Sequence, residues 1–245
     1  MSIVPRTHDC YEHYELKAFE KLFSCDGCKM KGFGQRYQCN LCGNELHKEC
    51  KSPKATITHE FFARSTFTFR EKPFTRYGFN HQREFSKICD ACGKEIRGFS
   101  YHCEEDNLDV HPYCLNLEKN VLISKDTVFN LEANVVSKCI WCKKKKISDD
   151  SRGVLGWSYI STCRKYHFHV YCMAEMAHEA CVRSGGEMVL ENVELRSLAK
   201  KRSRRKMVVV EMIKSILKIV FAALLGDPTV LISSAIVELL SRGLS

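Results

Sequence analysis

Residues 25 to 50, CDGCKMKGFGQRYQCNLCGNELHKEC, place five cysteines and one histidine within 26 residues and contain no long apolar run. Apolar burial alone cannot hold such a segment, because domains below roughly 40 residues usually need a disulfide or a metal ion to fold. The cysteines form C-x2-C pairs that are followed by H-x2-C. Disulfides need no histidine at fixed offsets, whereas tetrahedral zinc sites combine cysteine with histidine. The spacing therefore favours zinc over disulfides.

The cysteine content of the whole chain indicates a reducing compartment. The 245 residues include 15 cysteines, an odd number, and 10 histidines. The first residues, MSIVPRTHDCYEHYELK, lack the apolar stretch of a secretory signal peptide. In the reducing interior of a cell, thiols stay available to a metal. We therefore expect an intracellular protein that is not secreted, and the cytoplasm, a membrane surface and the nucleus all remain open.

The chain repeats the metal-binding pattern of residues 25–50 at an offset of 64. The repeated positions hold the same residue types at five of six places, and an aspartate stands at the sixth: Cys89, Cys92, Cys103, Asp106, His111 and Cys114. Tyr37 and Gly34 also recur, as Tyr101 and Gly98. Self-similarity at a fixed offset is typical of an array of structural modules.

A third, looser copy follows. Cys139 and Cys142 form its first pair, and HFHVYC ends in the H-x2-C of His169 and Cys172. Tyr159 and Gly156 stand 10 and 13 residues before His169, as the corresponding residues do in the other copies. An insertion, KKKKISDDSRGVL, lengthens the loop after the first pair. The third unit keeps the frame but alters part of the ligand set.

These patterns predict small zinc-stabilised α+β modules in tandem, followed by a C-terminal α-helical hairpin. Each module should consist of short β-hairpins and a short helix. Little else in the units could form a core, so seven aromatic residues should pack beside the metals: Phe23, Phe33, Tyr37, Phe99, Tyr101, Trp157 and Tyr159. The expected boundaries are 8–62 for the first module with two interleaved zinc sites, 63–124 and 125–183 for two degenerate modules, 184–206 for a basic linker and 207–245 for the hairpin.

One unit carries more candidate ligands than one zinc ion can use, because zinc takes four. Two ions are therefore expected in the first unit and about four in the chain. The candidate ligands of the three units are His13, Cys25, Cys28, Cys39, Cys42, His47, Cys50, His59, Cys89, Cys92, Cys103, His111, Cys114, Cys139, Cys142, His169, Cys172 and Cys181. His8, His102, His178 and Cys10 read as surface residues or as residues satisfied by other contacts.

The pattern H-x11-C-x2-C-x10-C-x2-C-x4-H-x2-C, together with YHCEEDNLDVHPYCLNL, resembles the phorbol-ester/diacylglycerol-type zinc-finger family of protein kinase C regulatory regions. It is most similar to the divergent form found in tandem in cysteine/histidine-rich plant proteins, over residues 8–182. The resemblance implies interleaved ligands in the first unit. One site would contain His13, Cys39, Cys42 and Cys50, and the other would contain Cys25, Cys28, His47 and His59.

The second unit departs from the family pattern. Tyr77 stands at the first-histidine position, and Ile123 at the last-ligand position. The resemblance leaves Cys89, Cys92 and His111 for one site and Cys103 with Cys114 for the other. His81, Asp106 or a solvent molecule could complete either site. Asp106 is equally well read as a surface residue.

In the third unit, the resemblance implies one full site, made by Cys139, Cys142, His169 and Cys181. Cys172 would belong to the other site. Whether Cys163 and His167 accompany it there is left open by the sequence.

Basic charge is concentrated in two runs, KKKK at 143–146 and KKRSRRK at 200–206, within a net charge of +9. The second run leads into two expected helices. Glu211, Lys214 and Lys218 lie on one face of the first, which argues against a transmembrane span. An amphipathic helix on an acidic membrane through residues 200–245, a hairpin packed on the zinc units, and a nuclear-import signal all remain open.

No catalytic constellation stands out, because every histidine near a cysteine is better explained as a metal ligand. We expect a non-enzymatic adaptor or interaction protein that binds Zn²⁺ and acts in signalling or stress responses, as the resemblance implies. Binding of diacylglycerol or acidic lipid is the alternative, and thiol–disulfide exchange through C-x2-C is disfavoured. Nucleic acid is disfavoured as a partner, since no groove-reading motif is present. The sequence identifies neither the protein partner nor the oligomeric state.

Overall fold

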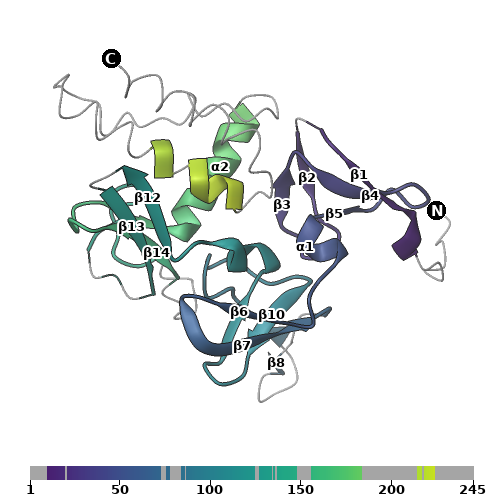
Figure 1. Ribbon diagram of the computed structural model, residues 1–245, viewed down its shortest axis with the longest axis horizontal. Helices are drawn as coiled ribbons and strands as arrows, with labels where there is room; N and C mark the ends of the chain where they lie inside the picture. The colour runs from purple at the N-terminus through teal and green to yellow at the C-terminus, as the bar shows by residue number, and fades with distance from the viewer. Residues whose placement is uncertain are drawn as a thin grey trace.

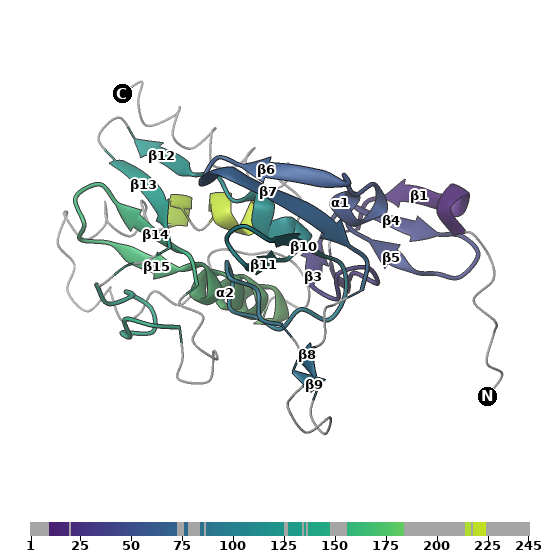
Figure 2. The ribbon, with the colours of Figure 1, turned by 90° about the horizontal axis from the view of Figure 1, so that it is seen from below.

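The described part of the chain folds as three successive modules (Figure 1). Each module contains one C-x2-C pair that belongs to a cysteine/histidine group. Turned by 90°, the modules follow one another from right to left, with the second between the other two (Figure 2). The computed structural model describes residues 10–19, 21–72, 76–77, 84–85, 87–124, 127–133, 135, 137–147, 156–183, 214–216 and 218–223. Residues 184–206, His8 and His81 lie outside this part.

The first module combines a three-stranded antiparallel sheet of order β1-β4-β5 with the β2-β3 hairpin and one turn of helix. Its helix begins directly after His47 and carries Cys50 on its buried side. The elements are η1 (Cys10–His13), β1 (Tyr14–Lys17), β2 (Leu22–Ser24), β3 (Lys31–Phe33), β4 (Arg36–Cys39), β5 (Glu45–Leu46) and α1 (Lys48–Lys51).

The second module is a four-stranded antiparallel sheet of order β11-β10-β7-β6. Strand β6 lies within the residues expected for the first module, yet it pairs with β7, where Ile57 faces Phe67. Phe67 on β7 is fully buried in the core of the second module. Burial of this apolar side chain favours the pairing of β6 with β7, so the linker strand becomes part of the second module. The elements are β6 (Thr56–His59), β7 (Phe62–Arg70), β8 (Arg76–Tyr77), β9 (Glu84–Phe85), β10 (Ser100–Cys103), β11 (Leu108–Val110) and η2 (Pro112–Asn116).

The third module is a four-stranded antiparallel sheet of order β12-β13-β14-β15, followed by the longest helix described, α2. Every residue of β14 and β15 is buried, so both strands belong to the core. The elements are β12 (Asn120–Ser124), β13 (Thr127–Glu132), β14 (Ser158–Ser161), β15 (His167–His169) and α2 (Val170–Arg183).

The first C-x2-C pair of every module forms the same tight turn, called here the zinc knuckle (residues 25–28, 89–92 and 139–142). The residue after each knuckle adopts a left-handed conformation, with φ of 63° at Lys29, 68° at Gly93 and 61° at Lys143. Its N–H donates to the carbonyl of the first knuckle cysteine over 2.9, 2.8 and 2.9 Å, respectively. The three modules therefore share one backbone frame, although two of these positions carry a lysine at a φ that glycine adopts more easily.

Neighbouring modules dock through one repeated backbone contact. The Phe99 N–H of the second module donates to the Gly27 carbonyl in the first knuckle over 3.0 Å. The Trp157 N–H of the third module donates to the Ala91 carbonyl in the second knuckle over 2.9 Å. Gly27 and Ala91 are equivalent knuckle positions, so the interface between the first and second modules and the interface between the second and third modules are copies of one arrangement.

A side-chain contact repeats in the same two interfaces. The Tyr101 hydroxyl donates to the Lys54 carbonyl over 2.9 Å, and the Tyr159 hydroxyl donates to the Glu118 carbonyl over 2.7 Å. Both carbonyls belong to the linker that leaves the preceding module. The tyrosines expected to pack beside the metals therefore also fix how each module sits on the one before it.

The apolar core is larger than the sequence suggested. One contiguous cluster of buried side chains joins the second and third modules and includes the fully buried Phe67, Phe129 and Phe168. The first module has a smaller cluster built on Phe23, Leu46 and its cysteines. The expectation that little besides the metals could form a core is corrected: β7, β13 and β15 bring distant aromatic residues together, which local spacing does not reveal.

Of the expected C-terminal hairpin, only residues 214–216 and 218–223 are described, and they are helical. Ile216, Val220 and Phe221 are buried within the large core cluster, and the segment lies beside α2 (Figure 1). These apolar side chains pack on the zinc modules. No helix in the described part is long and apolar enough to cross a membrane.

Candidate metal centres

Three groups of three cysteines and one histidine recur, one in each module. Within each group the possible ligand atoms all lie within 4.8 Å of one another. Two of the groups are wholly buried, and in the third only Cys142 is partly exposed. The groups are Cys25, Cys28, His47 and Cys50; Cys89, Cys92, His111 and Cys114; and Cys139, Cys142, His169 and Cys172.

The distances between donor atoms fit tetrahedral zinc. Bond lengths of about 2.3 Å to sulfur and about 2.0 Å to nitrogen place two ligand sulfurs ~3.8 Å apart and a sulfur and nitrogen ~3.6 Å apart. The Cys89 and Cys114 sulfurs are 3.7 Å apart. Cys92 Sγ lies 3.4 Å from His111 Nδ1, and Cys172 Sγ lies 3.6 Å from His169 Nδ1. The sulfurs are too far apart for a disulfide of about 2.05 Å.

Backbone carbonyls orient the histidine rings. His111 Nε2 lies 3.3 Å from the Glu95 carbonyl, and His169 Nε2 lies 3.1 Å from the Lys145 carbonyl. An N–H donated there leaves Nδ1 unprotonated and directed at the sulfurs, which is how a metal-bound histidine is usually supported. The buried His47 Nε2 finds no such acceptor among the described residues. Its ring packs edge-on against Tyr113 instead, with centroids 4.0 Å apart.

The closely packed thiols of the third group favour binding of a divalent cation over binding of protons. A hydrogen bond from Cys172 lowers the pKa of Cys139 to about 3. The same shared proton, with burial, raises the pKa of Cys172 well above its usual range. Without a metal, therefore, one thiol of the pair is ionised only because the other keeps its proton. A zinc ion would let all the sulfurs of a group ionise together, since its charge offsets their mutual repulsion.

The grouping corrects the ligand pairing that the family resemblance implied. Cys50, Cys114 and Cys172 were each expected in the other site of their module, but each lies in the group of the first C-x2-C pair and the histidine. The physical reason is the turn of helix that follows each histidine. In an H-x2-C sequence, residues three apart face the same side of that turn and point at the same ion.

Two histidines expected as ligands have other surroundings. His59 Nε2 lies 2.7 Å from the Leu117 carbonyl, and its ring lies 5.6 Å from the Trp157 ring. This residue therefore links the linker strand to the later modules rather than to the first zinc group. His13 is exposed and belongs to none of the groups found among the described residues. For Cys181, only its position in α2 is described, and Cys172 is the residue found as the fourth member of the group with Cys139, Cys142 and His169.

A fourth group in the first module contains Cys10, Cys39 and Cys42. The sulfurs of Cys10 and Cys42 are 3.6 Å apart, which again suits a shared zinc ion. The described residues supply three ligands here. Sequence reasoning chose His13 and dismissed Cys10, although η1 brings Cys10 to the second C-x2-C pair. No local spacing marks Cys10 as a ligand, because its contact with Cys42 joins positions 32 residues apart.

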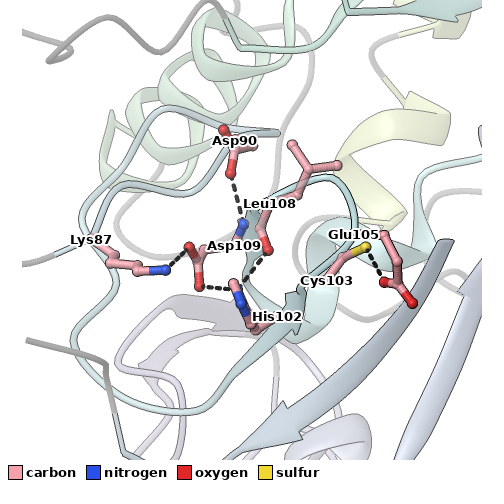
Figure 3. A network of polar contacts seen from close by, with 7 residues as sticks. All are labelled: Lys87, Asp90, His102, Cys103, Glu105, Leu108 and Asp109. Atoms are coloured by element: carbon pink, nitrogen blue, oxygen red, sulfur yellow. Dashed lines mark hydrogen bonds and ion pairs between the residues drawn. The ribbon is translucent and has the colours of Figure 1, made fainter.

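The corresponding place in the second module holds hydrogen bonds instead. Cys103 Sγ contacts the Glu105 carboxylate at 3.1 Å, and Figure 3 shows this contact pointing away from the neighbouring network. Burial raises the pKa of the Cys103 thiol. Asp106, considered as a ligand, accepts a hydrogen bond from Ser65. Cys103 joins no metal group in the described part of this module.

A charged network braces the hairpin of β10 and β11 next to the second zinc group (Figure 3). The buried Asp109 carboxylate contacts Lys87 and lies 3.0 Å from His102 Nδ1. The Asp109 N–H donates to the Asp90 carboxylate over 2.7 Å. Asp90 lies inside the zinc knuckle, so the network ties the knuckle to the strand that leads into His111.

The two residues left open in the third module also lie outside its zinc group. Cys163 Sγ contacts the Ser161 hydroxyl at 3.3 Å. His167 Nδ1 lies 3.0 Å from the Ser137 carbonyl, and burial lowers the pKa of His167. Cys163 therefore supports the β14-β15 turn, whereas His167 links β15 to the residues just before the third zinc knuckle.

Comparison with known proteins agrees with this geometry. Residues 72–115, which include the second zinc group, match the family model of the C1 domain. A Drosophila melanogaster protein described as a putative protein kinase C delta type homolog is 30% identical over 132 residues, which cover 47% of this chain and 19% of that relative. No solved structure matches significantly. The resemblance to the phorbol-ester/diacylglycerol-type zinc-finger family and zinc as the cofactor are confirmed, and residues 72–115 are similar to a C1 domain.

Proposed function

We propose that this chain, which carries a C1 domain within a tandem of similar zinc modules, is a non-enzymatic adaptor for protein partners in intracellular signalling or stress responses. The C1 match and the kinase-homolog relative support a regulatory setting. The repeated docking contacts support a single scaffold on which partners could assemble. Structural zinc sites and a rigid scaffold are typical of interaction modules.

One observation carries the proposal: each of the three Cys3His groups offers four ligands, which is all that a structural zinc ion takes. A catalytic zinc site keeps one position for water or substrate. In the groups of the first two modules all four ligands are buried, so no such position faces solvent. The zinc ions of these groups would stabilise the fold without acting on a substrate.

Cobalt substitution tests the closed state of these sites. Co²⁺ in a tetrahedral sulfur-rich site absorbs visible light, and an open position binds azide or cyanide with a change in that spectrum. For cobalt-loaded full-length protein, we expect a spectrum that does not respond to these ligands. A saturable spectral change would show an open position and would revive an enzymatic function.

The C1 match also favours a second candidate, diacylglycerol or acidic-lipid binding by the modules. Ten residues separate Cys28 from Cys39 in the first module, and Lys29 and Lys31 there are exposed. Such a short, charged loop is poorly suited to entering an apolar membrane. Flotation with liposomes, with and without diacylglycerol, distinguishes the candidates: we expect no diacylglycerol-dependent binding, and such binding would favour the lipid function.

Thiol–disulfide exchange stays disfavoured, because both cysteines of every first C-x2-C pair belong to a Cys3His group. A thiolate held by zinc is a weak nucleophile for exchange. Zinc-loaded protein is expected to be inactive in an insulin-reduction assay. Catalytic turnover at a rate comparable to that of a thioredoxin would support the redox function instead.

A further inference from the structure

The zinc knuckle of the third module is followed by four consecutive lysines, Lys143–Lys146, called here the lysine loop. All four residues are exposed. None of them forms an ion pair with a carboxylate in the part of the chain that the structure describes. Lys138, just before the knuckle, is exposed as well. The loop therefore presents a concentrated positive charge to solvent.

The equivalent loops of the other modules are occupied by intramolecular contacts. Lys94 pairs with Glu175 of the third module over 2.6 Å. Lys29 lies 3.6 Å from Asp26, its partner in the same turn. Both loops line a cavity of about 450 Å³ at the junction of the three modules, closed on one side by α2. In the third module, by contrast, no carboxylate among the described residues pairs with the four exposed lysines, so the lysine loop is the copy whose charge is not matched internally.

The third zinc centre holds the backbone of the lysine loop. The Cys139 N–H donates to the Lys144 carbonyl over 2.9 Å, and His169 Nε2 lies 3.1 Å from the Lys145 carbonyl. The Lys143 N–H donates a hydrogen bond to the Cys139 carbonyl over 2.9 Å. Two zinc ligands thus fix the positions from which the lysine side chains project. A loop held in this way loses little conformational entropy when a partner binds.

We propose that the lysine loop is the docking site for an acidic segment of a protein partner. This inference rests on the proposed adaptor function and specifies its partner chemistry. Carboxylates from such a segment would complete the ion pairs that Glu175 already provides for Lys94 in the second module. The ion pair between Lys94 and Glu175 therefore shows the kind of contact that the lysine loop would form with the partner.

Two other polyanions fit the surroundings less well. A membrane contact usually adds an apolar anchor beside the lysines. The exposed large apolar residues of the described part are Leu16, Leu41 and Leu122, and Leu122 lies on β12, at the opposite edge of the sheet from β15. Single-stranded nucleic acid needs exposed aromatic rings for stacking. Trp141, in the third knuckle, packs against the core cluster instead.

The test measures binding of zinc-loaded full-length protein to a fluorescent glutamate-rich peptide at low salt. The loop variant changes all four lysines to glutamine: Lys143→Gln, Lys144→Gln, Lys145→Gln and Lys146→Gln. A matched control neutralises four exposed lysines elsewhere, namely Lys21, Lys48, Lys54 and Lys119, so that both variants lose the same charge. Native mass spectrometry first verifies that each variant keeps the zinc content of the parent protein.

We expect the loop variant to bind the peptide about tenfold or more weakly, because several ion pairs of modest strength are lost together. The control is expected to change affinity less than about twofold, by general charge alone. Equal losses in the two variants, or no loss in the loop variant, would overturn the proposal. Anionic phosphatidylserine vesicles and a single-stranded oligonucleotide are measured in parallel. Loop-dependent binding to either, without peptide binding, would overturn it in favour of a membrane or nucleic acid.

Zinc dependence gives an independent readout. Protein stripped of zinc keeps all its lysines, yet its peptide affinity should fall to that of the loop variant. Unchanged affinity would contradict the role of the zinc centre in holding the loop. The outcome is separable from the proposed function: open cobalt sites with intact loop binding would refute the non-enzymatic function alone, whereas closed sites without loop binding would refute this inference alone.

Discussion

The zinc groups of the second and third modules have the same ligands at nearly the same distances, but they differ in what covers them. The sulfur of the second knuckle cysteine lies 3.4 Å from the histidine Nδ1 in both groups. Cys92 is 0% exposed, whereas Cys142 is partly exposed. The third module covers the second knuckle through Trp157, and no described module covers the third. The third module buries Cys139, His169 and Cys172 by itself, and a neighbouring module adds the cover that the second knuckle cysteine lacks there.

The third residue of each zinc knuckle is small where a neighbouring module covers the knuckle and large where no described module does. It is Gly27 in the first module and Ala91 in the second, where a neighbour docks, and Trp141 in the third. A Cβ atom on Gly27 would lie 2.6 Å from the Phe99 ring, so only a very small residue fits under that neighbour. Small knuckle residues therefore accompany docking, and a large one accompanies the uncovered end.

The largest expected effect comes from removing one ligand from each group. Cys92→Ser should lose the second zinc and unfold the middle module together with both interfaces, because structural zinc contributes about 10 kcal/mol or more to folding. Cys142→Ser should lose only the third zinc and leave the first two modules folded. Native mass spectrometry and amide NMR spectra of the two variants measure this. Loss of the same number of zinc ions and unfolding of the same modules in both variants would contradict the difference between the second and third groups.

The next effect tests docking without touching a ligand. A Cβ atom on Gly98 would lie 2.0 Å from the backbone oxygen of Gly27, so Gly98→Ala should force the first two modules apart. We expect a loss of about 3 kcal/mol in unfolding free energy by chemical denaturation. Gly43→Ala is the control, since Gly43 has a φ of +74° but open space around it, and strain alone should cost about 1 kcal/mol. A smaller loss for Gly98→Ala than for the control would contradict the docking contact.

Zinc release should follow exposure. With a chromogenic chelator, we expect the Cys139 group to lose zinc about tenfold faster than the Cys89 group, which corresponds to about 1.4 kcal/mol of extra protection by the covering module. The Cys142→Ser variant shows which kinetic phase of zinc release belongs to the third group, because the fast phase should be absent from its release curve. Release from the second group before the third would refute protection by the neighbour.

The smallest expected effect concerns the repeated tyrosines. Tyr101→Phe and Tyr159→Phe each remove one hydroxyl that donates to a linker carbonyl, so each should lower the unfolding free energy by about 1 kcal/mol. Denaturation of both variants measures it. Because the two contacts are copies, the losses should agree within a factor of two, and a loss confined to one tyrosine would show that the interfaces differ.

Sequence reasoning found what depends on local spacing and missed what depends on long-range packing. Zinc, the repeat offset and the residue types of the ligands follow from C-x2-C and H-x2-C alone. The assignment of Cys50, Cys114 and Cys172 was carried over from a family pattern, although the turn of helix after each histidine predicts the observed grouping. Cys10 and His59 needed three-dimensional information, because their contacts join segments 32 and 58 residues apart.

The central claim is that zinc ions bound by the three Cys3His groups hold the modules in shape. Native mass spectrometry of full-length protein purified without chelators tests it most directly. We expect a compact, low-charge species with at least three zinc ions per chain, which converts to an extended, highly charged species when zinc is removed. A compact species that carries no metal would contradict the account.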